Sequence, residues 1–138
     1  MSSSHFRPLT VLIFLLMAFT LGACSHNIRE EFDMSLDKYN RILNRNEIET
    51  ACLFAAAGIR DEYIAKAGNI KNTRIIDYHV VNAAYSEDKL QATVDVDISY
   101  YSLFTNKVKS VRDTQQWIYS EEKGVKGWRI NSLLPEFK

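Results

Sequence analysis

The chain has 138 residues, and its 17 lysines and arginines balance 17 aspartates and glutamates, so the formal net charge is zero. Binding to nucleic acid through phosphates requires an excess of basic charge, and this balance argues against that class of partner. A chain of this length is expected to form one domain with one hydrophobic core, and we find no internal repeat or low-complexity tract.

The first predicted element is a signal peptide. Arg7 supplies the one fixed positive charge near the start, and residues 9–21 (LTVLIFLLMAFTL) carry no charge. This run is too short for a membrane span, which needs about 20 apolar residues, but it fits the apolar region of a secretory signal. Gly22 and Ala23 are small residues of the kind found at a cleavage site. We therefore predict that residues 1–23 form a signal peptide.

The residues at the end of this run are more specific. Leu21-Gly22-Ala23-Cys24 resembles the lipobox of bacterial lipoproteins. The resemblance implies that the Cys24 sulfur carries a diacylglycerol and that the signal is cut before this residue. It also implies an outer-membrane anchor facing the periplasm rather than an inner-membrane anchor, because Ser25 replaces the aspartate that favours retention. Several acyl chains, at ~0.8 kcal/mol per buried methylene, would anchor the protein firmly. The alternative is an ordinary secretory signal with an incidental cysteine.

Cys52 is the second and last cysteine of the sequence. If Cys24 carries lipid, Cys52 has no partner and no intramolecular disulfide can form. Its neighbours in ETACLFAAAG are mostly apolar, so we expect a small core residue rather than a nucleophile. Removal of the signal also removes Arg7, which leaves 16 basic and 17 acidic residues in the mature chain.

Helical periodicity dominates the first half of the mature chain. After residues 24–27, which we expect to form a lipidated tether, apolar residues recur at steps of three or four over 28–44 and predict a helix. A second apolar stripe follows, and Gly58 is expected to divide it into a helix and a short third helix over 59–67. Both stripes are predicted to face the core.

From Thr73 onward the period changes to two. The alternation is clearest between Leu90 and Tyr101, which predicts a strand with one buried and one solvated face. Hairpin-length connections predict antiparallel pairing. We therefore expect an α+β domain over residues 28–138, with two or three N-terminal helices packed on one face of a curved four-stranded antiparallel sheet. The predicted strands are residues 73–85, 90–101, 107–120 and 127–134.

Strand parity also predicts which side chains share the buried face. Val94 and Val96 are expected inside, and directly opposite residues share a face. We therefore predict that Val96 lies opposite Trp117 and Val94 opposite Tyr119 on the next strand. Two alternations compete in the strand over 73–85, and the pattern does not decide between them.

The last two strands carry aromatic motifs, Trp117-Ile118-Tyr119 and Gly127-Trp128-Arg129-Ile130, on either side of a charged turn with a glycine. With helices first and long antiparallel strands after them, residues 28–137 resemble the nuclear transport factor 2-like superfamily. The resemblance implies a cystatin-like cone. Some members are isomerases, dehydratases or ligand binders that use the space between helices and sheet, and others are small bacterial envelope lipoproteins.

An enzyme of that kind needs an acid or base in an apolar cavity. Asp95 and Asp97 are expected on the solvated face, and His79 is the one histidine well inside the domain, without a Cys/His cluster for a metal. Asp77 and Tyr78 could act as base and donor, but nothing nearby in the sequence completes a site. We predict no catalytic centre, no metal and no cofactor.

An aromatic cluster marks the end of the second strand, in SYYSLFTNK. Exposed aromatic residues with a polar rim are typical of partner sites, so Tyr100, Tyr101 and Phe104 are the candidate contacts. We predict a non-enzymatic, membrane-anchored envelope lipoprotein that binds a protein partner or scaffolds an assembly. The alternatives are a small apolar ligand in the helix–sheet cavity and, third, an isomerase- or dehydratase-like enzyme.

Overall fold

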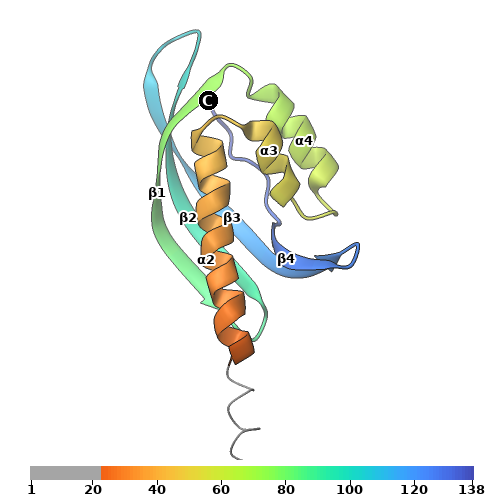
Figure 1. The fold of residues 1–138 in the computed structure, drawn as a ribbon. Helices are drawn as coiled ribbons and strands as arrows, with labels where there is room; N and C mark the ends of the chain where they lie inside the picture. Colours follow the sequence, from red (N-terminus) through yellow and green to blue (C-terminus); the bar gives the residue numbers. More distant parts are fainter. Residues whose placement is uncertain (1–22) are drawn as a thin grey trace, which may run out of the picture.

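The computed structural model describes residues 23–138, with residues 23–26 described by their backbone alone, so most of the predicted signal peptide lies outside the described residues. Three α-helices and a 3-10 helix precede four strands, which form one open antiparallel sheet in the order β1-β2-β3-β4 (Figure 1). The predicted α+β class is confirmed. The elements are α2 (Ala23–Asn44), α3 (Ile48–Ala51), η1 (Cys52–Phe54), α4 (Arg60–Asn69), β1 (Thr73–Ser86), β2 (Gln91–Ser102), β3 (Val108–Glu122) and β4 (Val125–Ile130).

Helix α2 ends at Asn44, as predicted, but it begins at Ala23 and so includes residues 24–27, which the sequence analysis assigns to a tether. Asn46 follows the helix with a φ of 61°, a left-handed conformation that asparagine tolerates better than most residues. The Asn46 side chain also accepts a hydrogen bond from the Ile75 backbone N–H at 2.8 Å, which ties the end of α2 to β1. No helix in the described part of the chain is long and apolar enough to span a membrane.

The second helix is shorter than the pattern predicts. After α3 and η1, Ala55 turns extended, with a φ of −65° and a ψ of 134°. Ala55 forms a bridge with Ile130, and the Ala56 backbone N–H donates to the Ile130 carbonyl at 2.8 Å. Because this contact with β4 replaces helical hydrogen bonds, the helix ends before Gly58, and the predicted role of Gly58 as the breaker is wrong.

Strand β1 contains two β-bulges, which explain its ambiguous pattern. The register with β2 shifts between Ile75 and Asp77, and again between Val80 and Asn82. Each bulge adds one residue and reverses the faces that follow it. Ile75 is therefore buried while the next residue is exposed, and Tyr78 is partly buried against the core three positions later. Neither simple alternation describes this strand.

The register of β2 against β3 differs from the prediction by four residues. Val96 does not lie opposite Trp117, because Trp117 pairs with Ala92 and Asp113 takes the place opposite Val96. The second predicted pair fails by the same shift. The connection over 103–107 is short, so β2 and β3 already pair at Tyr101 and Val108. The aromatic residues of β3 therefore lie opposite the first residues of β2. A register shift by an even number of residues leaves each side chain on the same face of the sheet, so Trp117 is buried as predicted.

The turn between β3 and β4 is also shorter than the turn predicted over residues 121–127. Lys123 and Gly124 alone connect β3 and β4, with φ values of 51° and 79°. Positive φ at both central residues defines the type I′ turn that joins tight hairpins. Val125 and Lys126 therefore belong to β4, which ends at Ile130 rather than continuing to residue 134.

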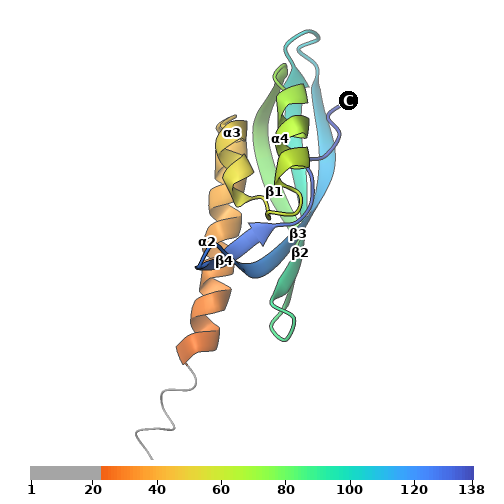
Figure 2. The same cartoon turned by 90° about the vertical axis from the view of Figure 1, so that its right-hand side faces the viewer.

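Aromatic rings connect α2 with the sheet, beside which it lies in two perpendicular views (Figures 1 and 2). The Phe32 ring lies 4.9 Å from the Trp128 ring, and the Tyr39 ring lies 5.4 Å from the Trp117 ring. The Trp128 indole N–H also donates to the Ile28 carbonyl at 3.0 Å. These four rings are buried and form the centre of the core.

Candidate functional site

The connection between β2 and β3 exposes a cluster of apolar side chains, which we call the hairpin tip and define as residues 101–108. Phe104 is 80% exposed and Val108 is 68% exposed, and Leu103 lies exposed beside them. Tyr101 is partly exposed and pairs with Val108 across the two strands, so both side chains lie on the same face. The hairpin tip thus combines an aromatic anchor with aliphatic neighbours.

Backbone hydrogen bonds fix the shape of the hairpin tip. The Ser102 carbonyl accepts from the Asn106 backbone N–H at 2.9 Å, and the Leu103 backbone N–H donates to the Asn72 carbonyl at 2.8 Å. Asn106 adopts a φ of 51°, which asparagine tolerates in turns. Phe104 is therefore exposed on an ordered turn, and a partner that binds it would lose little ordering entropy.

The C-terminal residues cover Tyr100, the third predicted contact. Tyr100 is only 4% exposed, and its ring lies 4.9 Å from the Phe137 ring. Its hydroxyl donates to the Lys138 carbonyl at 2.7 Å and accepts from the Lys138 backbone N–H at 3.0 Å. Tyr101 and Phe104 remain as accessible candidates, and Leu103 and Val108 join them.

The hairpin tip lies at the end of the domain opposite to the start of α2, as both views show (Figures 1 and 2). Cys24 belongs to the first turn of α2, although its side chain is not among those described. The hairpin tip therefore faces away from the predicted lipid anchor.

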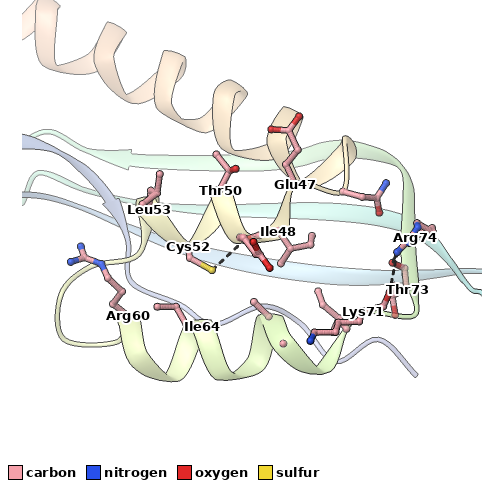
Figure 3. A pocket seen from close by; sticks show the side chains of 15 residues that line it. Glu47, Ile48, Thr50, Cys52, Leu53, Arg60, Ile64, Lys71, Thr73 and Arg74 are labelled. Carbon is pink, nitrogen blue, oxygen red and sulfur yellow. Dashed lines mark hydrogen bonds between the residues drawn. The ribbon is translucent and has the colours of Figure 1, made fainter.

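A groove of about 830 Å³ lies between α3 and α4 (Figure 3). Its lining is largely apolar, and Leu53 and Ile64 are exposed in it. The Cys52 thiol donates to the Ile48 carbonyl at 3.3 Å, and burial raises the pKa of this thiol. Cys52 is a buried member of the core, as predicted. Lys71 and Arg74 lie toward one end of the groove, and Figure 3 shows the Glu47 carboxylate directed away from α4.

A buried polar cluster joins β3 to α2. The Gln115 side-chain N–H group donates to Asn40 Oδ1 at 2.9 Å and to Asp113 Oδ2 at 3.0 Å, and Gln115 Oε1 accepts from the Trp117 indole N–H at 3.2 Å. Asp113 is 3% exposed, and burial raises the pKa of this carboxyl from 3.8 to about 6. Sequence reasoning missed this cluster because Asp113 and Gln115 are polar, although both share the strand parity of the buried Trp117.

A pair of buried tyrosines lies close to this cluster. The Tyr39 hydroxyl of α2 and the Tyr63 hydroxyl of α4 are 2.6 Å apart. Burial raises the pKa of both phenols, and the nearby Asp113 raises them further, so both remain protonated near neutral pH. Neither Asp113 nor this pair lines the groove between α3 and α4.

The acidic and histidine residues considered from the sequence lie away from the core. Asp97 forms a two-point contact with Arg112, at 2.8 and 2.9 Å, and this hydrogen bonding lowers the Asp97 pKa. Asp95 accepts a hydrogen bond from the Thr114 hydroxyl at 2.8 Å. His79 and Asp77, the other two candidates from the sequence, are exposed. Among the described residues, no three His, Cys, Asp or Glu side chains gather in a metal-binding arrangement.

No protein-family model matches this chain, and no curated protein matches it. The function proposed below therefore depends on the N-terminal motif and on the chemistry of the described residues.

Proposed function

We propose that this protein is a lipoprotein of the bacterial cell envelope whose domain binds a protein partner through the hairpin tip. In this proposal the signal over residues 1–23 is removed and Cys24 carries the lipid. The domain is held at the outer membrane and faces the periplasm. Its sheet curves around helices packed on one face, in the cone that the nuclear transport factor 2-like resemblance implies.

The observation that carries this proposal is the exposure of Phe104 on an ordered turn. A large aromatic residue with exposed aliphatic neighbours is typical of the central contact of a protein interface. The hairpin tip contains Lys107 and Lys109 follows it, and residues 101–109 contain no acidic residue. The chemistry of the hairpin tip therefore fits an apolar pocket with an acidic rim on the partner. Its position opposite the predicted anchor directs it toward another protein rather than toward the anchoring membrane.

Photocrosslinking in intact bacterial cells tests this assignment. With a photoreactive amino acid at Phe104, we expect a discrete crosslink to one protein. The matched control is Val125, which is 60% exposed and follows the turn of the β3–β4 hairpin. Phe104→Asp should weaken co-purification of the partner by roughly tenfold or more, because loss of a central interface residue commonly costs about 2 kcal/mol. Val125→Asp should leave it unchanged. Equal crosslinking at both positions, or crosslinks to lipid alone, would contradict the proposal.

A second candidate function is the binding of a small apolar ligand, and the groove between α3 and α4 favours it. The volume of about 830 Å³ falls within the range of small-molecule sites. The sequence analysis places such a ligand between the helices and the sheet, whereas this groove lies between α3 and α4. A fluorescent fatty acid tests this alternative. Saturable binding that Ile64→Asp abolishes and that Phe104→Asp preserves would identify the groove as the functional site. Because Asp113 does not line it, the groove and the buried carboxyl do not combine into a catalytic pocket.

A further inference from the structure

Strand β1 forms one edge of the sheet, and in the described part of the chain no further strand lies beyond it (Figure 1). Six consecutive residues of β1, 79–84, are exposed. Residues 78–86 contain no proline, aspartate, glutamate, lysine or arginine. Natural proteins often place charged residues and prolines on an edge strand to prevent pairing with another chain. This part of β1 lacks both kinds of protection.

The pairing with β2 decides which backbone groups of β1 point to the free edge. Successive residues of an antiparallel strand direct their N–H and C=O groups alternately to one side and the other. Ile75, opposite Tyr100, points to the free edge, because the Asn46 side chain binds its N–H at 2.8 Å and its C=O at 3.1 Å. Both bulges add a residue to β1 and none to β2. The β1 residues opposite even-numbered residues of β2 therefore share this direction, and they are Tyr78, Val80, Ala83 and Tyr85.

Side chains of the protein already occupy the first half of this edge. Asn46 binds both backbone groups of Ile75, as a neighbouring strand would. The next outward N–H group, that of Tyr78, donates to Asp77 Oδ1 at 2.9 Å. Among the described residues, none accepts a hydrogen bond from the three outward N–H groups that follow. The open part of the edge is therefore residues 80–85.

We propose that residues 80–85 bind an extended segment of a protein partner, which adds a fifth strand to the sheet. In this mode of binding, main-chain hydrogen bonds provide affinity and alternate side chains provide specificity. The bulge at Val81 twists the edge, so a short segment fits it better than the long flat edge of another sheet. This surface is separate from the hairpin tip, and the proposal does not depend on the function proposed for the tip.

The neighbouring side chains specify the chemistry of the segment. Val80 and Ala83 lie opposite two buried valines of β2 and share the side of the sheet that faces the helices. On the other side, Asp77 and Asp95 form no ion pair among the described residues. The segment should therefore direct apolar side chains toward the helices and at least one basic side chain toward the opposite side.

The partner is a different protein rather than a second copy of this chain. Two copies related by a two-fold axis would pair their β1 strands antiparallel. Strand β1 runs from the hairpin tip toward the end of the domain where α2 begins (Figure 1). Antiparallel pairing would therefore place the two predicted lipid anchors at opposite ends of the dimer, where they could not enter the same membrane.

Photocrosslinking from Val81 in the full chain, in bacterial cells, tests the proposal, since this side chain is 45% exposed. We expect a crosslink to a segment of another protein that alternates apolar with polar or basic residues. Ala83→Pro removes one outward N–H group and leaves the hydrogen bonds to β2 in place, so it should lower the crosslink yield roughly tenfold or more. Ala83→Ser keeps the N–H group and is the matched control, which should crosslink as the wild type does.

Three results would overturn the proposal. The first is an equal crosslink yield in Ala83→Pro and Ala83→Ser. The second is a crosslink to β1 of a second copy or to lipid alone. The third does not require a variant to fold: in the purified full chain, hydrogen exchange should be fast at the Ala83 and Tyr85 amides and slow at the Ala84 amide. Slow exchange at all three would mean that the edge is already covered. Crosslinking from Phe104 reports on the hairpin tip separately, so the two proposals fail or succeed independently.

Discussion

Trp128→Ala is expected to lower the free energy of unfolding by about 3–5 kcal/mol, the usual cost of removing a large aromatic side chain from a packed core. Trp128 is 2% exposed and contacts the rings of Phe32, Tyr85 and Tyr119, at 4.9, 5.8 and 5.6 Å. The substitution also removes the indole N–H that donates to the Ile28 carbonyl. Urea denaturation of a protein comprising residues 25–138 measures the loss.

Asp95→Ala is the control for this prediction. The Asp95 side chain lies on the opposite side of the sheet and hydrogen bonds to the Thr114 hydroxyl. A surface substitution of this kind should change the free energy of unfolding by no more than about 0.5 kcal/mol. Equal losses for Trp128→Ala and Asp95→Ala would mean that the inner and outer faces of the sheet are assigned incorrectly.

Gln115→Ala is expected to cost about 3–5 kcal/mol, although glutamine is usually a surface residue. The Gln115 side chain is fully buried and serves three partners, which are Asn40, Asp113 and the indole N–H of Trp117. Each buried polar group left without a partner costs about 1–3 kcal/mol, and the substitution opens a cavity as well. The same urea denaturation measures this loss.

The neighbouring residue provides a matched control. Gln116 is exposed, and its side chain accepts a hydrogen bond from the Thr93 hydroxyl at 3.1 Å. Gln116→Ala should therefore stay within about 0.5 kcal/mol of the wild type. If the two glutamine variants lose the same stability, the polar cluster does not hold α2 and β3 together.

The elements that depend on local pattern could be predicted from the sequence. The end of α2 at Asn44 follows from apolar spacing, and the buried face of β2 follows from strict alternation. The features that depend on contacts with residues far away in the sequence could not be predicted from it. Helix α3 stops early because Ala55 and Ala56 meet Ile130, which is far away in the sequence. The bulges of β1 likewise depend on its pairing with β2.

The site residues show the same division. Phe104 is exposed because it lies in a turn, which the local sequence indicates. Tyr100 belongs to the inner face by alternation, but its cover by Phe137 and Lys138 depends on the path of the C-terminus. Asp113 shares the inner face with Trp117 by alternation, but its contact with Gln115, and through Gln115 with Asn40 of α2, depends on the fold.

The lipid anchor is the central claim, because it places the domain at a membrane and turns the hairpin tip away from it. The most direct test is the intact mass of the protein extracted from bacterial membranes. We predict a chain that begins at Cys24 and is heavier than residues 24–138 by its acyl groups, and Cys24→Ser should abolish both the cleavage and the added mass. A soluble, unmodified chain from the wild type would contradict the account.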